Sequence, residues 1–195
     1  MSEIRGEDWY GEDLAGVQHS GVRFVDVDLT EVRTRGATFE DCVFESCRFN
    51  ASAHDATAFV GCTFSGCNLF DVTFEGCKLS GTTFSRCTLK PITVRGGSWR
   101  GVSLRGADLS GQDLSGVDLR DADLSAARLK GARLRGANLG GALLRECDLT
   151  EADLRGCALD GVELTAAVLR GTVVDLHGAV ALAELTGAVV DATAQ

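Results

Sequence analysis

The stretch "GADLSGQDLSGVDLRDADLSAARLKGARLRGANLG", residues 106–140, has a leucine at every fifth position. A helix returns to the same face every 3.6 residues and a strand every 2, so neither element places every fifth residue on one side. The interval of five therefore indicates a repeat architecture, in which each short unit adopts the same local structure.

The same register extends over most of the chain. Counted in fives from Leu109, it holds without an insertion from Trp9 to Val174, which is 34 consecutive units, and the central residue is Leu or Phe in 27 of them. The residue two positions before the centre is usually small, and all eight cysteines stand there. Twenty of the 24 glycines stand two positions after the centre, where a tight bend needs them.

Such units cannot bury their central residues alone, and stacking of successive turns does so. The sequence therefore predicts two regions, a solenoid over residues 1–174 and a different C-terminal segment over residues 175–195. In that segment Asp175 is a plausible N-cap for a short helix near residues 176–185, and Gly187 is a stop signal. We expect the helix either to cap the open end or to pair with its twin in a two-fold dimer. The residues expected at that dimer interface are Leu176, Val180, Leu182 and Ala183.

The unit pattern resembles the pentapeptide-repeat family, whose repeat is A(D/N)LXX, and "GADLSGQDLSGVDLRDADLS" matches it closely. The resemblance implies an all-β fold, a right-handed quadrilateral β-helix with four units in each turn of 20 residues. With that turn length, one interior column contains Phe24, Phe44, Phe64 and Phe84 and then changes to leucines. Another column contains Thr34 and His54 as neighbours, which predicts a polar patch or a local distortion in the interior.

Three features are similar to the MfpA/Qnr group of this family: the uninterrupted register, the "CTLKPITV" stretch around Pro91 and the "VVDLHGAVALAELTG" ending. This resemblance implies a homodimer joined through the C-terminal ends. It also implies binding to DNA gyrase by imitation of duplex DNA, with protection from fluoroquinolones or other topoisomerase poisons. Some members of the group carry projecting loops that are important for protection, and the unbroken register here leaves no room for them.

The charge of the chain limits the kinds of partner that it can bind. A formal net charge of −9 disfavours general nucleic-acid binding and favours a basic protein. About eight and a half turns spaced by about 4.8 Å give a rod of roughly 40 Å. A dimer would carry about one net charge per 4–5 Å, compared with one per about 1.7 Å in duplex DNA. Net charge alone is therefore too low for DNA mimicry, and the placement of the carboxylates must supply the rest.

The side of the rod that contains Trp9 and Leu29 has the most negative balance, −3. A run of aspartates also rings a single turn near residues 108–123. Each of these carboxylates has two interpretations, a contact with gyrase or an ordinary solvated residue at a position that is commonly Asp or Asn in the family. The candidate gyrase-binding residues are Glu7, Asp8, Asp28, Glu31, Asp71, Asp108, Asp113, Asp118, Asp123, Asp148 and Glu151.

The sequence does not point to catalysis. Cysteines in successive turns are about 4.8 Å apart and point in parallel directions, so they do not converge on a tetrahedral metal ion. The same spacing is longer than the Cβ–Cβ distance of about 3.8 Å in a disulfide. We therefore expect reduced thiols that fill the core. His19 and His54 occupy central positions and are expected to be buried. We expect no catalytic residues, metal, cofactor, small-molecule substrate, membrane contact or direct nucleic-acid contact. With neither a signal peptide nor a long apolar run, the expected location is cytoplasmic.

The resemblance and the acidic surface together predict a DNA-mimicking binding protein, and not an enzyme. Its expected partner is DNA gyrase, with topoisomerase IV as a second candidate, and its effect is to modulate the enzyme and protect it from poisons. The alternative is a structural or adaptor solenoid that binds an unrelated protein, because similarity of fold alone is weak support for a function.

Overall fold

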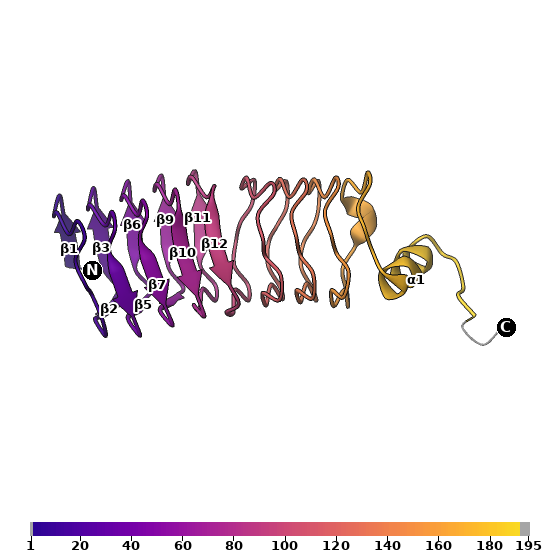
Figure 1. Ribbon diagram of the computed structural model, residues 1–195, viewed down its shortest axis with the longest axis horizontal. Coiled ribbons are helices and arrows are strands. Elements are labelled where there is room, and N and C mark those ends of the chain that lie inside the picture. The colour runs from indigo at the N-terminus through magenta and orange to yellow at the C-terminus, as the bar shows by residue number, and fades with distance from the viewer. Residues whose placement is uncertain (1, 192–195) are drawn as a thin grey trace.

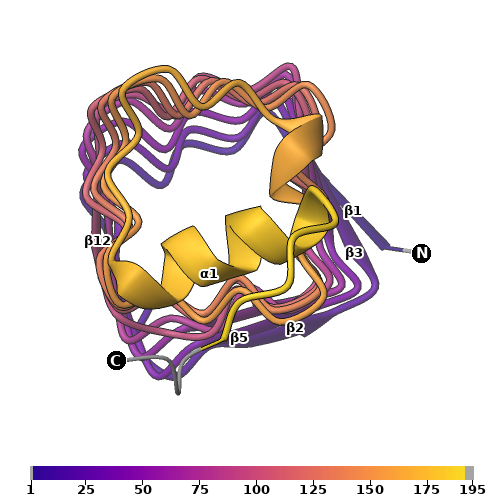
Figure 2. The same cartoon turned by 90° about the vertical axis from the view of Figure 1, so that its right-hand side faces the viewer.

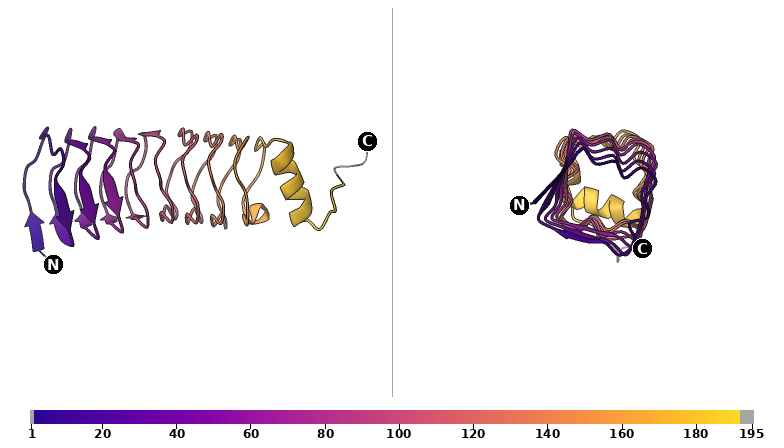
Figure 3. Two further views of the ribbon diagram at one scale, coloured as in Figure 1. Left: turned by 90° about the horizontal axis from the view of Figure 1, so that it is seen from below. Right: turned by 90° about the vertical axis from the view of Figure 1, so that its left-hand side faces the viewer.

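The computed structural model describes residues 2–191, which wind around one axis into a long square rod with a short helix at its C-terminal end (Figure 1). This is the right-handed quadrilateral β-helix that the family resemblance implied. Viewed along its axis, the rod is a stack of superimposed square turns (Figure 3). The strands are β1 (Ser2–Arg5), β2 (Gln18–Ser20), β3 (Val22–Val25), β4 (Arg33–Arg35), β5 (Thr38–Glu40), β6 (Val43–Glu45), β7 (Ala53–Asp55), β8 (Ala58–Val60), β9 (Thr63–Ser65), β10 (Val72–Glu75), β11 (Thr83–Ser85) and β12 (Ile92–Arg95).

Every strand pairs in parallel with residues exactly one turn away along the chain. The partners are twenty positions apart, as in Phe24 with Phe44 and Phe44 with Phe64. The ladders form a five-stranded sheet (β1-β3-β6-β9-β11), a four-stranded sheet (β12-β10-β7-β4) and a three-stranded sheet (β2-β5-β8) on separate sides. Beyond β12 the same interval continues as isolated bridges up to Asp153 with Val173. The four-unit turn is therefore present in the rod.

The corners explain the glycines of the repeat. Most residues two positions after a centre have a positive φ, for example +65° at Gly101, whose N–H donates to the Arg120 carbonyl in the next turn. Twelve non-glycine residues adopt the same conformation, among them Ala51 at +55° and Asp71 at +60°. The bend therefore prefers glycine and tolerates other residues at a modest cost in strain.

The axis of the rod is filled by columns of like side chains. The rings of Phe24, Phe44, Phe64 and Phe84 stack with centroids 4.7, 4.7 and 4.8 Å apart, which is the spacing between neighbouring strands. Beyond Phe84 the column continues as buried leucines. Phe44 and Phe64 thus pack against phenylalanine on both sides, and the core grows with every added turn.

The position two residues before each centre, where the side chain is small and points inward, holds hydrogen-bond donors as well as apolar residues. The Cys67 thiol donates to the carbonyl of Phe44 at 3.3 Å, and the Thr82 hydroxyl donates to the carbonyl of Phe59 at 2.6 Å. Seven of the eight cysteines are buried, Cys87 is half-buried, and all are free thiols. The prediction of core-filling cysteines is confirmed. Burial raises the pKa of Cys77 to about 11 and that of Cys147 to about 12, so these thiols stay protonated at neutral pH.

The predicted polar patch surrounds His54, which is fully enclosed in the core. Its Nδ1 lies 2.8 Å from the Thr34 hydroxyl and its Nε2 lies 3.0 Å from the Ser52 hydroxyl. Thr34 also shares a hydrogen bond of 2.7 Å with Thr57. Both ring nitrogens are satisfied by neutral groups, and burial lowers the pKa of His54 to about 3. The imidazole is therefore held neutral in the folded rod.

The solenoid ends in a 3₁₀ turn, η1 (Leu164–Ala166), and the helix α1 (Leu176–Leu185), which lies across the open end (Figure 2). Asp175 is the N-cap, as predicted, and its Oδ1 accepts from the N–H of Gly178 at 3.0 Å. Its Oδ2 accepts from the N–H of Gly156 at 2.6 Å. In the preceding turn the equivalent N–H, that of Gly136, donates to the backbone carbonyl of Arg155. The Asp175 side chain therefore replaces a backbone acceptor in the last turn and also caps the helix.

We expect His54 to make stability fall in mild acid. Its folded-state pKa is below the value of about 6.5 for an unfolded histidine, so the unfolded chain takes up the proton first as the pH falls. The free energy of unfolding should decrease by about 2 kcal/mol between pH 6.5 and pH 5, and continue to fall toward pH 3. Urea denaturation at several pH values measures this, with His54→Phe losing most of the decrease. His19→Phe should lose less of it, because burial also lowers the pKa of His19 but His19 is less enclosed than His54. An equal decrease in His54→Phe would assign the effect to other groups.

Two neighbouring glycines should respond differently to alanine. A Cβ added at Gly97 would overlap the backbone carbonyl oxygen and nitrogen of Cys77, whereas one added at Gly96 meets no atom within 4 Å. Gly96 has a corner φ of +63°, which Ala51 also tolerates. We expect Gly96→Ala to cost about 1 kcal/mol and Gly97→Ala at least about 3 kcal/mol in denaturant unfolding. Equal costs for the two variants would contradict the close approach at Gly97.

Candidate protein-binding surface

Most outward aspartates first serve the backbone of their own corner. All eleven Asp and Asn residues that stand just before a centre accept a hydrogen bond from the N–H two positions later. The Asp108 carboxylate, for example, accepts from the Ser110 N–H at 3.1 Å and from the Ser110 hydroxyl at 2.6 Å. The acceptors are Asp8, Asp13, Asp28, Asn68, Asp108, Asp113, Asp118, Asp123, Asn138, Asp148 and Asp153. The position therefore has a structural role in its own corner, whether or not its side chain also contacts a partner.

Cations one turn away neutralise many of these carboxylates. Arg48 contacts Asp28 at 2.8 Å, and Arg128 contacts Asp108 at 3.1 Å. In both pairs the arginine lies twenty residues after the aspartate, directly above it in the next turn. The hydrogen bond from Arg48 lowers the pKa of Asp28 to about 2, so this carboxylate stays ionised. Exposed pairs of this kind contribute little to stability, but they reduce the local negative field.

The predicted ring of aspartates is therefore less negative than the sequence suggests. Asp113 pairs with Arg133 at 3.1 Å and Asp118 pairs with Arg120 at 2.7 Å. Of the four ring members, Asp123 alone has no ion pair within the described chain. The four lie on four different sides, one on each, so the rod does not bring them together on one surface.

Unpaired carboxylates gather on the Trp9 side, the side built around Trp9, Leu29, Phe49, Leu69 and the centres that follow at intervals of twenty residues. From residue 7 to residue 71 this side carries five carboxylates, and Arg48 is its one cation. From residue 90 onward it carries three carboxylates and four cations, so its charge reverses. Among the described residues, Glu7, Asp8, Glu31 and Asp71 have no ion-pair partner. We call residues 7–71 of this side the acidic patch.

Two exposed aromatic side chains lie in the acidic patch. Tyr10 is 57% exposed and Phe70 is 48% exposed, and both occupy the position just after a centre on this side. The Tyr10 hydroxyl donates to Glu31 at 2.8 Å, and this bond to a carboxylate raises the pKa of Tyr10. Aromatic groups beside charges are typical of the residues that contribute most to protein interfaces. Tyr10 and Phe70 were not among the residues predicted from the sequence, although their shared position in the repeat was a usable signal.

The C-terminal end holds the predicted dimer residues, which have different environments. A rotation of 100° per residue places Leu176, Val180 and Ala183 on one face of α1 and Leu182 on a different face. Leu176 is 80% exposed, whereas Leu182 packs against the core of its own chain. Leu182 therefore helps to attach α1 to the rod, and the other three remain candidates for an interface between chains.

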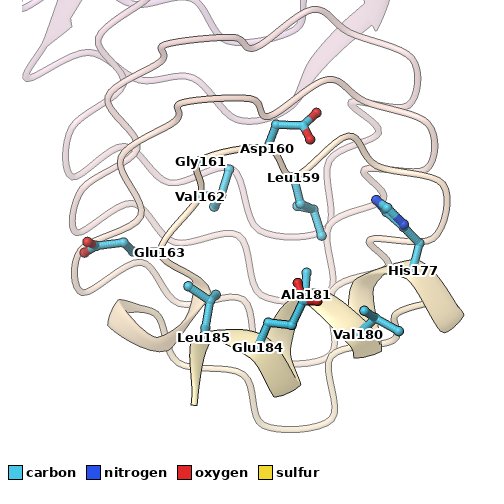
Figure 4. A pocket seen from close by; sticks show the side chains of 10 residues that line it. All are labelled: Leu159, Asp160, Gly161, Val162, Glu163, His177, Val180, Ala181, Glu184 and Leu185. Carbon is cyan, nitrogen blue, oxygen red and sulfur yellow. The ribbon is translucent and has the colours of Figure 1, made fainter. Parts of the chain in front are cut away.

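A groove of about 570 Å³ lies between α1 and the last turn of the rod (Figure 4). Leu159 and Val162 line it from the rod, and Val180, Ala181 and Leu185 line it from the helix. Asp160, Glu163, His177 and Glu184 add polar groups. The end of the solenoid is thus covered in part, and apolar surface stays accessible beside the helix.

Two further observations concern metal sites and membranes. Residues 2–191 contain no group of three or more His, Cys, Asp or Glu side chains arranged to hold a metal ion. In the same part of the chain, no helix has the length and hydrophobicity needed to cross a bilayer.

Comparison with solved structures finds rods of the same kind at low sequence identity. A trypsin-treated variant of QnrB1, a plasmid-mediated fluoroquinolone resistance protein, is 16% identical with a TM-score of 0.56, over 97% of this chain and 98% of that one. HetL, which is involved in heterocyst differentiation regulation in the cyanobacterium Nostoc sp. strain PCC 7120, is 22% identical with a TM-score of 0.36, over 87% and 84% of the two chains. No curated protein matches the sequence.

Two family models match the repeat itself. The model described as "Pentapeptide repeat region" matches residues 37–114. The model described as "Pentapeptide repeats (8 copies)" matches residues 103–141, 132–171 and 142–179. Together the matches run from residue 37 to residue 179, which is more than half of the chain, and the protein belongs to the pentapeptide repeat family.

Proposed function

We propose that this protein binds DNA gyrase through the acidic patch, modulates its activity and protects it from fluoroquinolones or other topoisomerase poisons. Topoisomerase IV is a second candidate target. The observation that carries the proposal is the concentration of unpaired carboxylates on one half of one side of a regular rod. The similarity in fold to a fluoroquinolone resistance protein supports the choice of target.

The acidic patch is suited to a basic protein groove that normally holds DNA. Its five carboxylates and single arginine extend over residues 7–71 along the rod, so the charge forms a line and not a cluster at one point. Successive turns place equivalent positions about 4.8 Å apart, which is longer than the spacing of about 1.7 Å between charges along duplex DNA. Tyr10 and Phe70 add contact area that a phosphate backbone lacks. The protein therefore imitates DNA in shape and sign of charge, and adds aromatic contacts of its own.

The proposed role is that of a binding protein without catalysis, acting as a homodimer joined at the C-terminal ends. In such a dimer the two acidic patches lie at the outer ends of a rod of about 80 Å, because each patch occupies the half of its chain remote from the helix. The two patches then meet equivalent surfaces of a partner that has two-fold symmetry.

Gyrase supercoiling should fall as the protein is added, and the effect should weaken as salt is raised, because salt screens interactions between exposed charges. A supercoiling titration at two salt concentrations, with and without a quinolone, measures both effects. If no gyrase or topoisomerase IV activity changes under either condition, the gyrase proposal is wrong. A structural or adaptor role with an unrelated protein partner is then the remaining candidate.

A matched pair of variants tests the location of the contact. Asp71 and Glu151 occupy the same corner position on the same side of the rod, both have a φ of +60°, and neither has an ion-pair partner in the described chain. Asp71 lies in the acidic patch and Glu151 lies near the helix end. We expect Asp71→Lys to weaken gyrase binding by about tenfold and Glu151→Lys by less than about twofold.

Titration of labelled gyrase with each variant supplies the affinities for this comparison. Thermal unfolding checks that both variants keep the fold, and the equal φ at the two sites makes their strain comparable. Equal losses for Asp71→Lys and Glu151→Lys would place the contact outside the acidic patch, or spread it over the whole side.

A further inference from the structure

The last turn of the rod presents an open strand edge to the groove beside α1. In the turn before it, the N–H groups of Leu139 and Gly141 donate to the carbonyls of Ala158 and Asp160 at 2.9 and 2.8 Å. The equivalent donors one turn later belong to Leu159 and Gly161. Within residues 2–191 these two N–H groups donate no hydrogen bond, because the chain turns into α1 where the next strand would lie.

This edge and the helix form the two walls of one groove. Leu159 and Gly161 both line it, and Val180 and Leu185 face them from α1 (Figure 4). An unpaired strand edge beside an apolar wall is the arrangement that binds an extended peptide by β-augmentation. The edge hydrogen-bonds the peptide backbone, and the wall takes its alternate side chains.

The chain itself carries a segment of matching chemistry. After α1, residues 188–191 read Ala-Val-Val-Asp. Val189 is 95% exposed, so its side chain is available to a second molecule. The segment continues beyond α1 and away from the rod, into the space that a second molecule stacked on this end would occupy (Figure 1). We propose that two copies exchange these tails, so that residues 188–190 of one chain add as a short strand to the 159–161 edge of its partner.

The size of the rod end favours tail exchange rather than a flat contact between the two ends. A side of five residues, at about 3.3 Å each, is at most about 16 Å long, and outward side chains enlarge the square end to roughly 700 Å². A protein interface of standard size buries about 800 Å² on each partner. A flat end-to-end contact would therefore be a small interface at best, whereas an inserted tail adds area and satisfies the two open donors. The inference rests on the C-terminal dimer of the proposed function and specifies how that dimer is held.

Substitution of the tail valine tests the exchange. Sedimentation velocity of the full chain over a range of concentrations should show a dimer that Val189→Asp weakens by at least tenfold. The control is Val173→Asp, which introduces the same charge at another exposed valine of the last turn and should leave the dimer unchanged. A dimer of unchanged affinity in Val189→Asp would overturn the exchange and leave the dimer itself standing. A monomeric wild-type chain would overturn both, and the gyrase titrations are judged separately from either result.

Cross-linking shows which chain receives the tail. Asp160→Cys and Val189→Cys chains carrying different tags are mixed and oxidised mildly, and the wild type with its native thiols serves as the control. The exchange predicts a disulfide-linked dimer that contains both tags. The double variant Asp160→Cys/Val189→Cys tests the alternative, because a disulfide within a monomer would place the tail in the groove of its own chain and refute the exchange.

Discussion

The parallel pairing of each residue with the residue twenty positions later is the constraint on which the rest of this structure depends. It fixes the strand spacing, and this spacing equals the separation of the stacked phenylalanine rings. It also places Arg48 over Asp28 and Arg128 over Asp108, so the surface charges pair by the same interval as the backbone. A change of one residue in the length of a turn would break the ladder, the core column and the ion pairs together, which explains why the register contains no insertion.

The sequence predicted the fold closely because the inward residues, the corner glycines and the surface positions all recur at the same interval of five. The interval of five identified the inward residues, the glycine phase identified the corners, and the Thr34–His54 neighbours predicted the polar patch. Asp175 and the helix bounds also followed from local signals, since a cap and a stop act on adjacent residues. Closure at four units came from the family resemblance, because a spacing of five is compatible with other numbers of sides.

The candidate binding surface was harder to predict for a physical reason. The formal charge gives every aspartate the same weight. In the structure, some aspartates form an ion pair with a nearby arginine and others do not. Asp118 accepts from both the N–H and the guanidinium of Arg120, while Asp71 has no cation to pair with in the described chain. Sorting charges by side identified the side on which the unpaired carboxylates gather. It did not separate the half of the side in which cations are scarce from the half in which they neutralise the surface.

The spacing between Glu31 and Asp71 limits the cost of keeping this part of the acidic patch charged. Glu31 and Asp71 lie two turns apart, or about 9.6 Å, which is close to the Debye length of about 8 Å at physiological salt. Their mutual repulsion is therefore largely screened by solvent. A basic partner in contact with the patch displaces that solvent and interacts with both groups at short range, where screening is weak. An acidic line with this spacing is stable in isolation and attractive to a cationic groove, and a denser line would favour binding at the expense of the rod.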